Sequence, residues 1–258
     1  MGLLTGKRAL VTGVANKRSI AWAIAKALSR EGAELALTYQ HERFQQNLEK
    51  LLPELPPSTV TLPLDVADDA SLAAMAASLA KRWDRLDIVV HSIAFAKAED
   101  LAGGFVDTSR DGFALAQDVS AYSLLALTRS VLPLLRAAGG GSVVTMTALG
   151  GERVMPSYNV MGVAKAALEM SVRYLAWELG SDNVRVNAIS AGPLRTLAAA
   201  GVKSAHSAMS QLPERSPLRR NITQEDVGDA AVFLLSDWAR NITGNVLFVD
   251  AGFHIMAN

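Results

Sequence analysis

Residues 8–21 read RALVTGVANKRSIA, a short apolar run followed by a glycine turn and the start of an amphipathic helix. The run Arg8–Thr12 fits a strand that is covered on both faces. Gly13 allows a tight turn after it, and the helix beginning at Ile20 can direct its first amides at a pyrophosphate. Only one glycine of the dinucleotide-binding pattern G-x-G-x-x-G is present, so an ordinary turn capped by Ser19 explains the stretch equally well.

The same alternation of apolar runs and amphipathic segments continues along the chain. The predicted strands are Arg8–Thr12, Glu34–Tyr39, Thr59–Leu64, Asp87–His91, Ser142–Thr147, Arg185–Ile189 and Val246–Asp250. The predicted helices are Ile20–Glu31, His41–Leu52, Asp69–Arg82, Asp111–Leu135, Tyr158–Gly180 and Gln224–Ser236. Gly32 and Gly180 are placed to end helices, and Thr223 with Asp226 forms a capping box. The pattern predicts an α/β fold: a Rossmann-like, doubly wound parallel sheet of about seven strands with helices on both faces.

Composition narrows the classes of function. The chain has 258 residues, half of them hydrophobic, with 25 basic and 25 acidic side chains and no cysteine. Balanced charge offers no basic surface for nucleic acid, and the lack of thiols excludes thiolate chemistry. No apolar run reaches the roughly 18 residues of a membrane span, so a cytoplasmic protein is expected. No metal site is predicted, because ligand spacing is absent among the histidines His41, His91, His206 and His254.

The ends of the second and third strands suggest how an adenosine group would be bound. Gln40 follows the second strand, where NAD sites often place an acidic residue for the ribose hydroxyls, and it can form those hydrogen bonds uncharged. Because no arginine stands beside it to pair with a 2′-phosphate, NADH is predicted over NADPH. Asp65 and Val66 follow the third strand and could bracket the adenine, although Asp65 could equally be a helix cap.

A tyrosine and a lysine lie where the fifth strand gives way to a helix. Tyr158 and Lys165 are seven residues apart, close to two helical turns, so they share one helix face. A nearby cation is expected to draw the phenol toward phenolate and to strengthen it as an acid or donor. Such a pair is usually a solvated surface, but its position on the ligand side of this sheet favours catalysis.

Together these motifs resemble the enoyl-acyl-carrier-protein reductases, a divergent branch of the short-chain dehydrogenase/reductase family. The spacing Tyr-x6-Lys distinguishes this branch from the Tyr-x3-Lys of other members, and Gly162 stands where their lysine would be. The matching segments are Leu10–Ala21, Thr38–Gln40, Leu86–Ala96, Tyr158–Lys165, Val184–Ala198, Pro217–Gly228 and Gly244–Gly252. The resemblance implies one dinucleotide-binding catalytic domain over residues 1–258, assembled as a homotetramer, that reduces a trans-2-enoyl thioester on acyl-carrier protein or CoA.

The resemblance also implies roles for individual residues. Tyr158 would hydrogen-bond the thioester oxygen as negative charge develops there, and Lys165 would hold the nicotinamide ribose. The residues implied in cofactor binding are Gly13, Ser19, Ile20, Gln40, Asp65, Val66, Ile93, Lys165, Leu194, Thr196 and Ala198. Those implied at the acyl group are Ala96, Tyr158, Met161, Ala148 and Ala205.

The acyl side departs from the family pattern. Ala148 stands where the family usually has a second tyrosine, and the segment 197–209 has Ala205 and Ala208 where bulky groups are common. The small residues of that segment and Gly201 predict a mobile substrate-binding loop. The alanines indicate either a roomier acyl site or drift compensated by methionines.

Three functions follow. The first is an NADH-dependent enoyl-thioester reductase of fatty acid biosynthesis. The second is a related reductase for a bulkier enoyl or ketone substrate in secondary metabolism. The third is a nucleotide-binding homologue with weakened catalysis, which the presence of both Tyr158 and Lys165 argues against.

Overall fold

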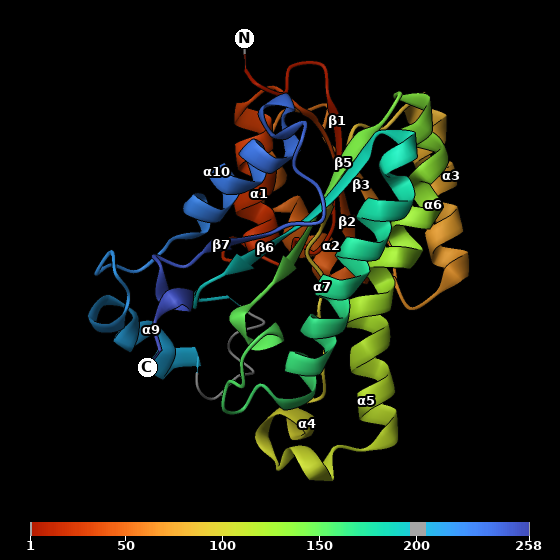
Figure 1. Cartoon of the computed structure of the whole chain (residues 1–258). Coiled ribbons are helices and arrows are strands. Elements are labelled where there is room, and N and C mark those ends of the chain that lie inside the picture. Colours follow the sequence, from red (N-terminus) through yellow and green to blue (C-terminus); the bar gives the residue numbers. More distant parts are fainter. Residues whose placement is uncertain (1, 197–204, 258) are drawn as a thin grey trace.

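The computed structural model describes residues 2–196 and 205–257 (Figure 1). Seven parallel strands form one sheet in the order β3-β2-β1-β4-β5-β6-β7, which confirms the predicted fold class. Their bounds are β1 Arg8–Val11, β2 Glu34–Tyr39, β3 Val60–Pro63, β4 Ile88–His91, β5 Gly141–Thr147, β6 Val184–Ala191 and β7 Val246–Val249. The strand order reverses direction between β1 and β4, the point at which doubly wound sheets bind their ligands.

Helices cover both faces of the sheet because alternate strand residues point to opposite sides. In β1, Ala9 and Val11 pack with α1, α2 and α10, whereas Leu10 packs with α3, α6 and α7. The bounds of the first layer are α1 Ile20–Arg30, α2 Glu42–Glu49 and α10 Gln224–Leu235. Those of the second are α3 Asp69–Arg82, α6 Ser123–Ala137 and α7 Asn159–Leu179.

Three further helices lie beyond the sheet, in the lower part of Figure 1. They are α4 Ala98–Ala102, α5 Arg110–Gln117 and α9 Ala205–Arg215. The segment 205–209, predicted as the end of a loop, is therefore helical, whereas 197–204 lies outside the described residues. No helix within the described part of the chain is long and apolar enough to cross a membrane.

One local prediction needed correction, and three were confirmed. The segment Asp111–Leu135 is not one regular helix: a π-helical turn, Asp118–Tyr122 (η3), separates α5 from α6. Gly180 is the C-cap residue of α7, as predicted, with φ −60°, and the left-handed residue of this turn is Asn183, with φ 56°. Gly32 has φ +90° as predicted. The capping box of Thr223 with Asp226 is also present.

Candidate active site

The turn after β1 is built so that two loop backbones touch. Gly13 has φ +87°, and a Cβ atom there would lie 1.9 Å from the carbonyl oxygen of Ser92, after β4. Only glycine fits this position. Ser19 precedes α1, but its hydroxyl donates to the Asn16 carbonyl at 2.7 Å and makes no capping hydrogen bond. The first turn of α1, beginning at Ile20, therefore has no side-chain cap from Ser19, which suits an anion at this helix end.

The two polar residues predicted for the adenosine end lie together. Gln40, after β2, donates from Nε2 to Asp65 Oδ2 at 3.3 Å. The other Asp65 oxygen accepts from the Ala67 amide at 3.0 Å, and Asp68 is the residue that caps α3, by accepting from the Ala70 amide. The interpretation of Asp65 as a helix cap was therefore wrong.

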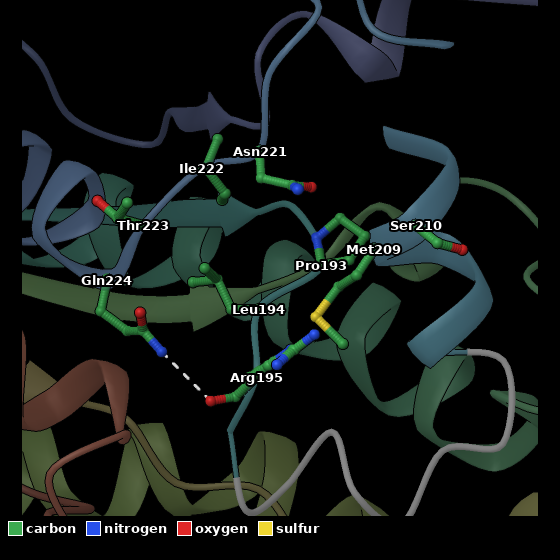
Figure 2. Close-up of a pocket in the computed structure, with 9 residues that line it drawn as sticks. All are labelled: Pro193, Leu194, Arg195, Met209, Ser210, Asn221, Ile222, Thr223 and Gln224. Atoms are coloured by element: carbon green, nitrogen blue, oxygen red, sulfur yellow. Dashed lines mark hydrogen bonds between the residues drawn. The ribbon is translucent and has the colours of Figure 1, made fainter. Parts of the chain in front are cut away.

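A pocket of about 510 Å³ opens after β6, between that strand and α9 (Figure 2). Gln224, the first residue of α10, donates from Nε2 to the carbonyls of Arg195 at 3.2 Å and Arg18 at 3.3 Å, joining the loops after β1 and β6. Sequence reasoning missed this residue, since a polar group at a helix start has many ordinary roles. The pocket is lined by Pro193, Leu194, Arg195, Met209, Ser210, Asn221, Ile222, Thr223 and Gln224.

The remaining predicted cofactor contacts lie along the same edge of the sheet. Leu194 and Val66 are buried, and half-buried Ile93 packs against the core beneath α3 and α6. Thr196 is half-buried and lies two residues beyond Leu194. Ala198 lies outside the described residues.

Tyr158 sits at the start of α7 in a small apolar cluster. Ala96 and Met161, both predicted at the acyl group, pack in the same cluster. The backbone of Gly150 covers the phenol ring so closely that a Cβ at Gly150 would lie 2.3 Å from Tyr158 Cδ1. Burial, and to a smaller extent Glu169, raises the pKa of Tyr158 well above its usual value. The raised pKa keeps the phenol protonated, as a hydrogen-bond donor requires, and the effect of Lys165 on Tyr158 stays a prediction.

Lys165 lies two turns further along α7 and is only 5% exposed. Its Nζ donates to the Met146 carbonyl of β5 at 2.8 Å. Burial lowers the pKa of Lys165 to about 8, with Glu169 opposing the decrease. The ammonium form therefore prevails at neutral pH.

Glu169, four residues beyond Lys165, is a buried acid that sequence reasoning missed. It is 3% exposed, and its Oε1 accepts from the Thr147 hydroxyl at 2.7 Å. Burial raises the pKa of Glu169, and the hydrogen bond from Thr147 opposes this. Its spacing from Lys165, one helical turn, was the available signal.

His91, at the end of β4, is fully buried between two hydroxyl groups. Its Nδ1 lies 2.8 Å from Thr145 Oγ1, and its Nε2 lies 2.8 Å from Ser123 Oγ. Since the Ser123 hydroxyl donates to the Val119 carbonyl, Nε2 carries the imidazole proton and Nδ1 accepts one from Thr145. Burial, followed by the charge of Lys165, lowers the pKa of His91 to about 3, so the ring is neutral.

The π-helical turn η3 connects this region to the loop after β4. The Ser120 hydroxyl accepts from the Phe95 amide at 2.9 Å and donates to the Phe95 carbonyl at 3.0 Å. Because Ala96 follows directly, these bonds fix the backbone beside a predicted acyl contact. A π turn inside a helix is frequently found at functional sites.

Two predicted substrate residues are less fully placed. Ala148 is half-buried with extended backbone (φ −151°), between β5 and the turn Leu149–Gly151 (η4). Ala205 is the first residue of α9, and its side chain lies outside the described part of the structure. Among residues 2–196 and 205–257, no three His, Cys, Asp or Glu side chains are grouped to hold a metal ion.

Known proteins share this sequence and architecture. A family profile described as enoyl-(acyl carrier protein) reductase matches residues 13–254. The NADH enoyl-acyl-carrier-protein reductase of Bacillus cereus is 52% identical over 257 residues, 99% of this chain and 100% of that protein. The corresponding Aquifex aeolicus protein is 51% identical over 256 residues, covering 99% and 94%.

Solved structures agree. The Bacillus cereus enzyme with NADP+ and indole naphthyridinone has a TM-score of 0.97 and 51% identity, with 100% of both chains covered. The Anaplasma phagocytophilum enzyme in complex with NAD has a TM-score of 0.94 and 45% identity, covering 100% of this chain and 97% of that one.

Proposed function

The chain belongs to the enoyl-acyl-carrier-protein reductase family, and we propose that it reduces the 2,3 double bond of a trans-2-enoyl thioester in fatty acid biosynthesis. When bound, NADH supplies the hydride for the β-carbon. The observation that carries the proposal is the pairing of Tyr158, a half-buried proton donor, with buried Lys165 on one face of α7, at the strand ends of a dinucleotide-type sheet.

The described residues fit a dinucleotide. The glycine-only turn at Gly13 allows close backbone approach, and the start of α1 at Ile20 offers amides to a pyrophosphate. The amide of Gln40 and the carboxylate of Asp65 suit ribose hydroxyls and would repel a 2′-phosphate, which supports NADH over NADPH. Ile93, Leu194, Thr196 and Ala198 would form the remaining cofactor wall.

Each catalytic residue has a separate task. Tyr158 donates a hydrogen bond to the thioester oxygen as negative charge grows there, a stabilisation that acts mainly in the transition state. Lys165 holds the nicotinamide ribose hydroxyls through its ammonium group. Ala96 and Met161, which pack beside Tyr158, form the wall against which the acyl group lies.

We extend this proposal to the acyl group that the enzyme accepts and to its assembly. Ala148 lacks the ring and hydroxyl usual in the family, which supports acceptance of bulkier enoyl groups; Ala205 would border the same space. The carrier is proposed to be acyl-carrier protein, the assembly a homotetramer and the location the cytoplasm, each on the family resemblance and the thioester substrate.

Steady-state oxidation of NADH tests the function. Crotonyl and dodecenoyl thioesters, each on CoA and on acyl-carrier protein, are expected to be reduced, with carrier protein preferred. Oxidation with neither thioester would contradict the proposal. Reduction of a ketone substrate in their place would favour the related reductase.

A further inference from the structure

Glu169 is a buried carboxylate to which the proposed reaction gives no task. It lies one helical turn beyond Lys165 on α7, and both side chains are almost fully enclosed, at 3% and 5% exposure. A buried acid is costly unless hydrogen bonds and an opposite charge compensate it. The arrangement around it therefore indicates a specific purpose.

The end of β5 holds both side chains in place. Thr147 donates its hydroxyl to Glu169 Oε1 at 2.7 Å, while the preceding carbonyl, of Met146, accepts from Lys165 Nζ at 2.8 Å. Two consecutive residues of one strand thus fix an acid and a base from the same helix face.

The turn η4 closes the other side of the carboxylate. A Cβ at Gly151 would lie 2.6 Å from Glu169 Oε1 and 3.2 Å from the backbone carbon of Lys165. Any larger residue at Gly151 would push the carboxylate away. The pair of glycines in η4 thus serves two purposes: Gly150 covers the ring of Tyr158, and Gly151 makes room for Glu169.

We propose that Glu169 is a positioning residue for the proposed reaction: anchored by Thr147 and one helical turn from Lys165, its carboxylate favours the charged form of that buried lysine, whose Nζ the Met146 carbonyl holds at the end of β5. The inference rests on the proposed function only for the task of Lys165 toward the cofactor. It assigns Glu169 no contact with substrate.

The other charged groups near the pair cannot replace Glu169. Glu152 follows η4, and Arg173 lies one turn beyond Glu169 on α7. Both side chains are exposed, and their charges are opposite in sign. His91 is neutral, and Tyr158 stays protonated. Burial alone lowers the pKa of Lys165, and Glu169 is the acid that opposes this effect.

Glu169→Gln tests the proposal, because glutamine keeps the size and an acceptor for Thr147 but removes the charge. In cofactor-free enzyme, NMR of 13C-labelled lysine side chains follows the titration of Lys165. The signal of Lys165 is identified as the one missing from the variant Lys165→Met. We expect the Lys165 midpoint to fall by about one pH unit in Glu169→Gln. NADH affinity is expected to fall at alkaline pH as Lys165 loses its proton, and in Glu169→Gln this fall should occur about one pH unit lower than in the wild type. At about pH 6, where Lys165 is charged in both proteins, the two affinities should be close.

Two further variants complete the test. Glu178→Gln removes an exposed acid from the same helix and should leave the Lys165 midpoint unchanged. Thr147→Val removes the donor that favours ionised Glu169 and should lower the midpoint by a smaller amount; it decides the matter if Glu169→Gln does not fold.

An unchanged Lys165 midpoint in a folded Glu169→Gln or Thr147→Val variant overturns the proposal. Failure of the proposed function would show differently, as wild-type enzyme that does not oxidise NADH with enoyl thioesters, while the lysine titration would still report on Glu169.

Discussion

The proposed adenosine end and the proposed catalytic end lie on the same edge of one sheet but are built by different means. At the adenosine end, the backbone contact of Gly13 with Ser92 and the exposed amide of Gln40 shape a polar surface open to solvent. At the catalytic end, Lys165 and Glu169 are enclosed by strand and turn, and burial moves their pKa values. The first region presents backbone shape and exposed polar groups, whereas the second holds charge away from water.

This difference predicts different responses to substitution. Where a site depends on buried donors and charges, one removed group leaves the transition state without a partner in a low-dielectric environment. Where a site depends on backbone shape, a substitution should first weaken ligand binding and lower the folding stability. Exposed neutral hydrogen bonds should tolerate exchange and alter preference more than rate.

The largest effect is expected from Tyr158→Phe. Removing the hydroxyl should lower kcat about 100-fold to 1,000-fold with little change in KM, because the hydrogen bond forms mainly as charge develops on the substrate. Steady-state NADH oxidation with an enoyl thioester measures this, and Tyr174→Phe, on the exposed side of the same helix, is the control. Normal turnover by Tyr158→Phe would mean that another group stabilises the oxygen.

Gly13→Ala should come next. The new Cβ meets the Ser92 carbonyl in a left-handed backbone, so we expect a loss of at least about 1–3 kcal/mol in the free energy of unfolding, with weakened NADH binding. Gly139→Ala is a matched control, since Gly139 has φ +76° but no atom near its Cβ position. Urea unfolding and NADH titration compare the two. Equal losses would show that backbone strain, rather than contact between the loops, makes glycine necessary.

Gln40→Arg should change preference more than rate. A guanidinium beside Asp65 can pair with a 2′-phosphate, so the ratio of kcat/KM for NADPH to that for NADH should rise about tenfold, or about 1.4 kcal/mol. Gln46→Arg adds the same charge on the exposed face of α2 and should leave the ratio unchanged. A general loss of turnover with both cofactors would instead show that the two ends of the site are coupled.

Ala148→Tyr is expected to have the smallest effect. A ring that fills space at the acyl site should shift preference from branched toward straight-chain thioesters by a few-fold, because each buried methylene contributes only about 0.8 kcal/mol. Ala148→Phe separates the ring from the hydroxyl. If competition assays show the same preference in all three proteins, the alanine is drift rather than an enlarged pocket.

Local signals predicted much of the molecule. Alternating apolar runs placed all seven strands, and the helical repeat put Tyr158 and Lys165 on one face. Regular periodicity could not show the π turn η3, because one extra residue in a helical turn leaves no mark in the apolar pattern; its Ser120 bonds to Phe95, 25 residues away.

What the sequence determined by itself is therefore the order of strands and helices, the glycine turn of the cofactor end and the register of the Tyr–Lys pair, since each depends on residues close together in the chain. The tertiary structure alone decided that Gln40 meets Asp65, that Thr147 anchors Glu169 and that His91 is locked neutral between two hydroxyls. Those contacts join distant segments, and the charge states that follow from them depend on how completely the packed chain excludes water.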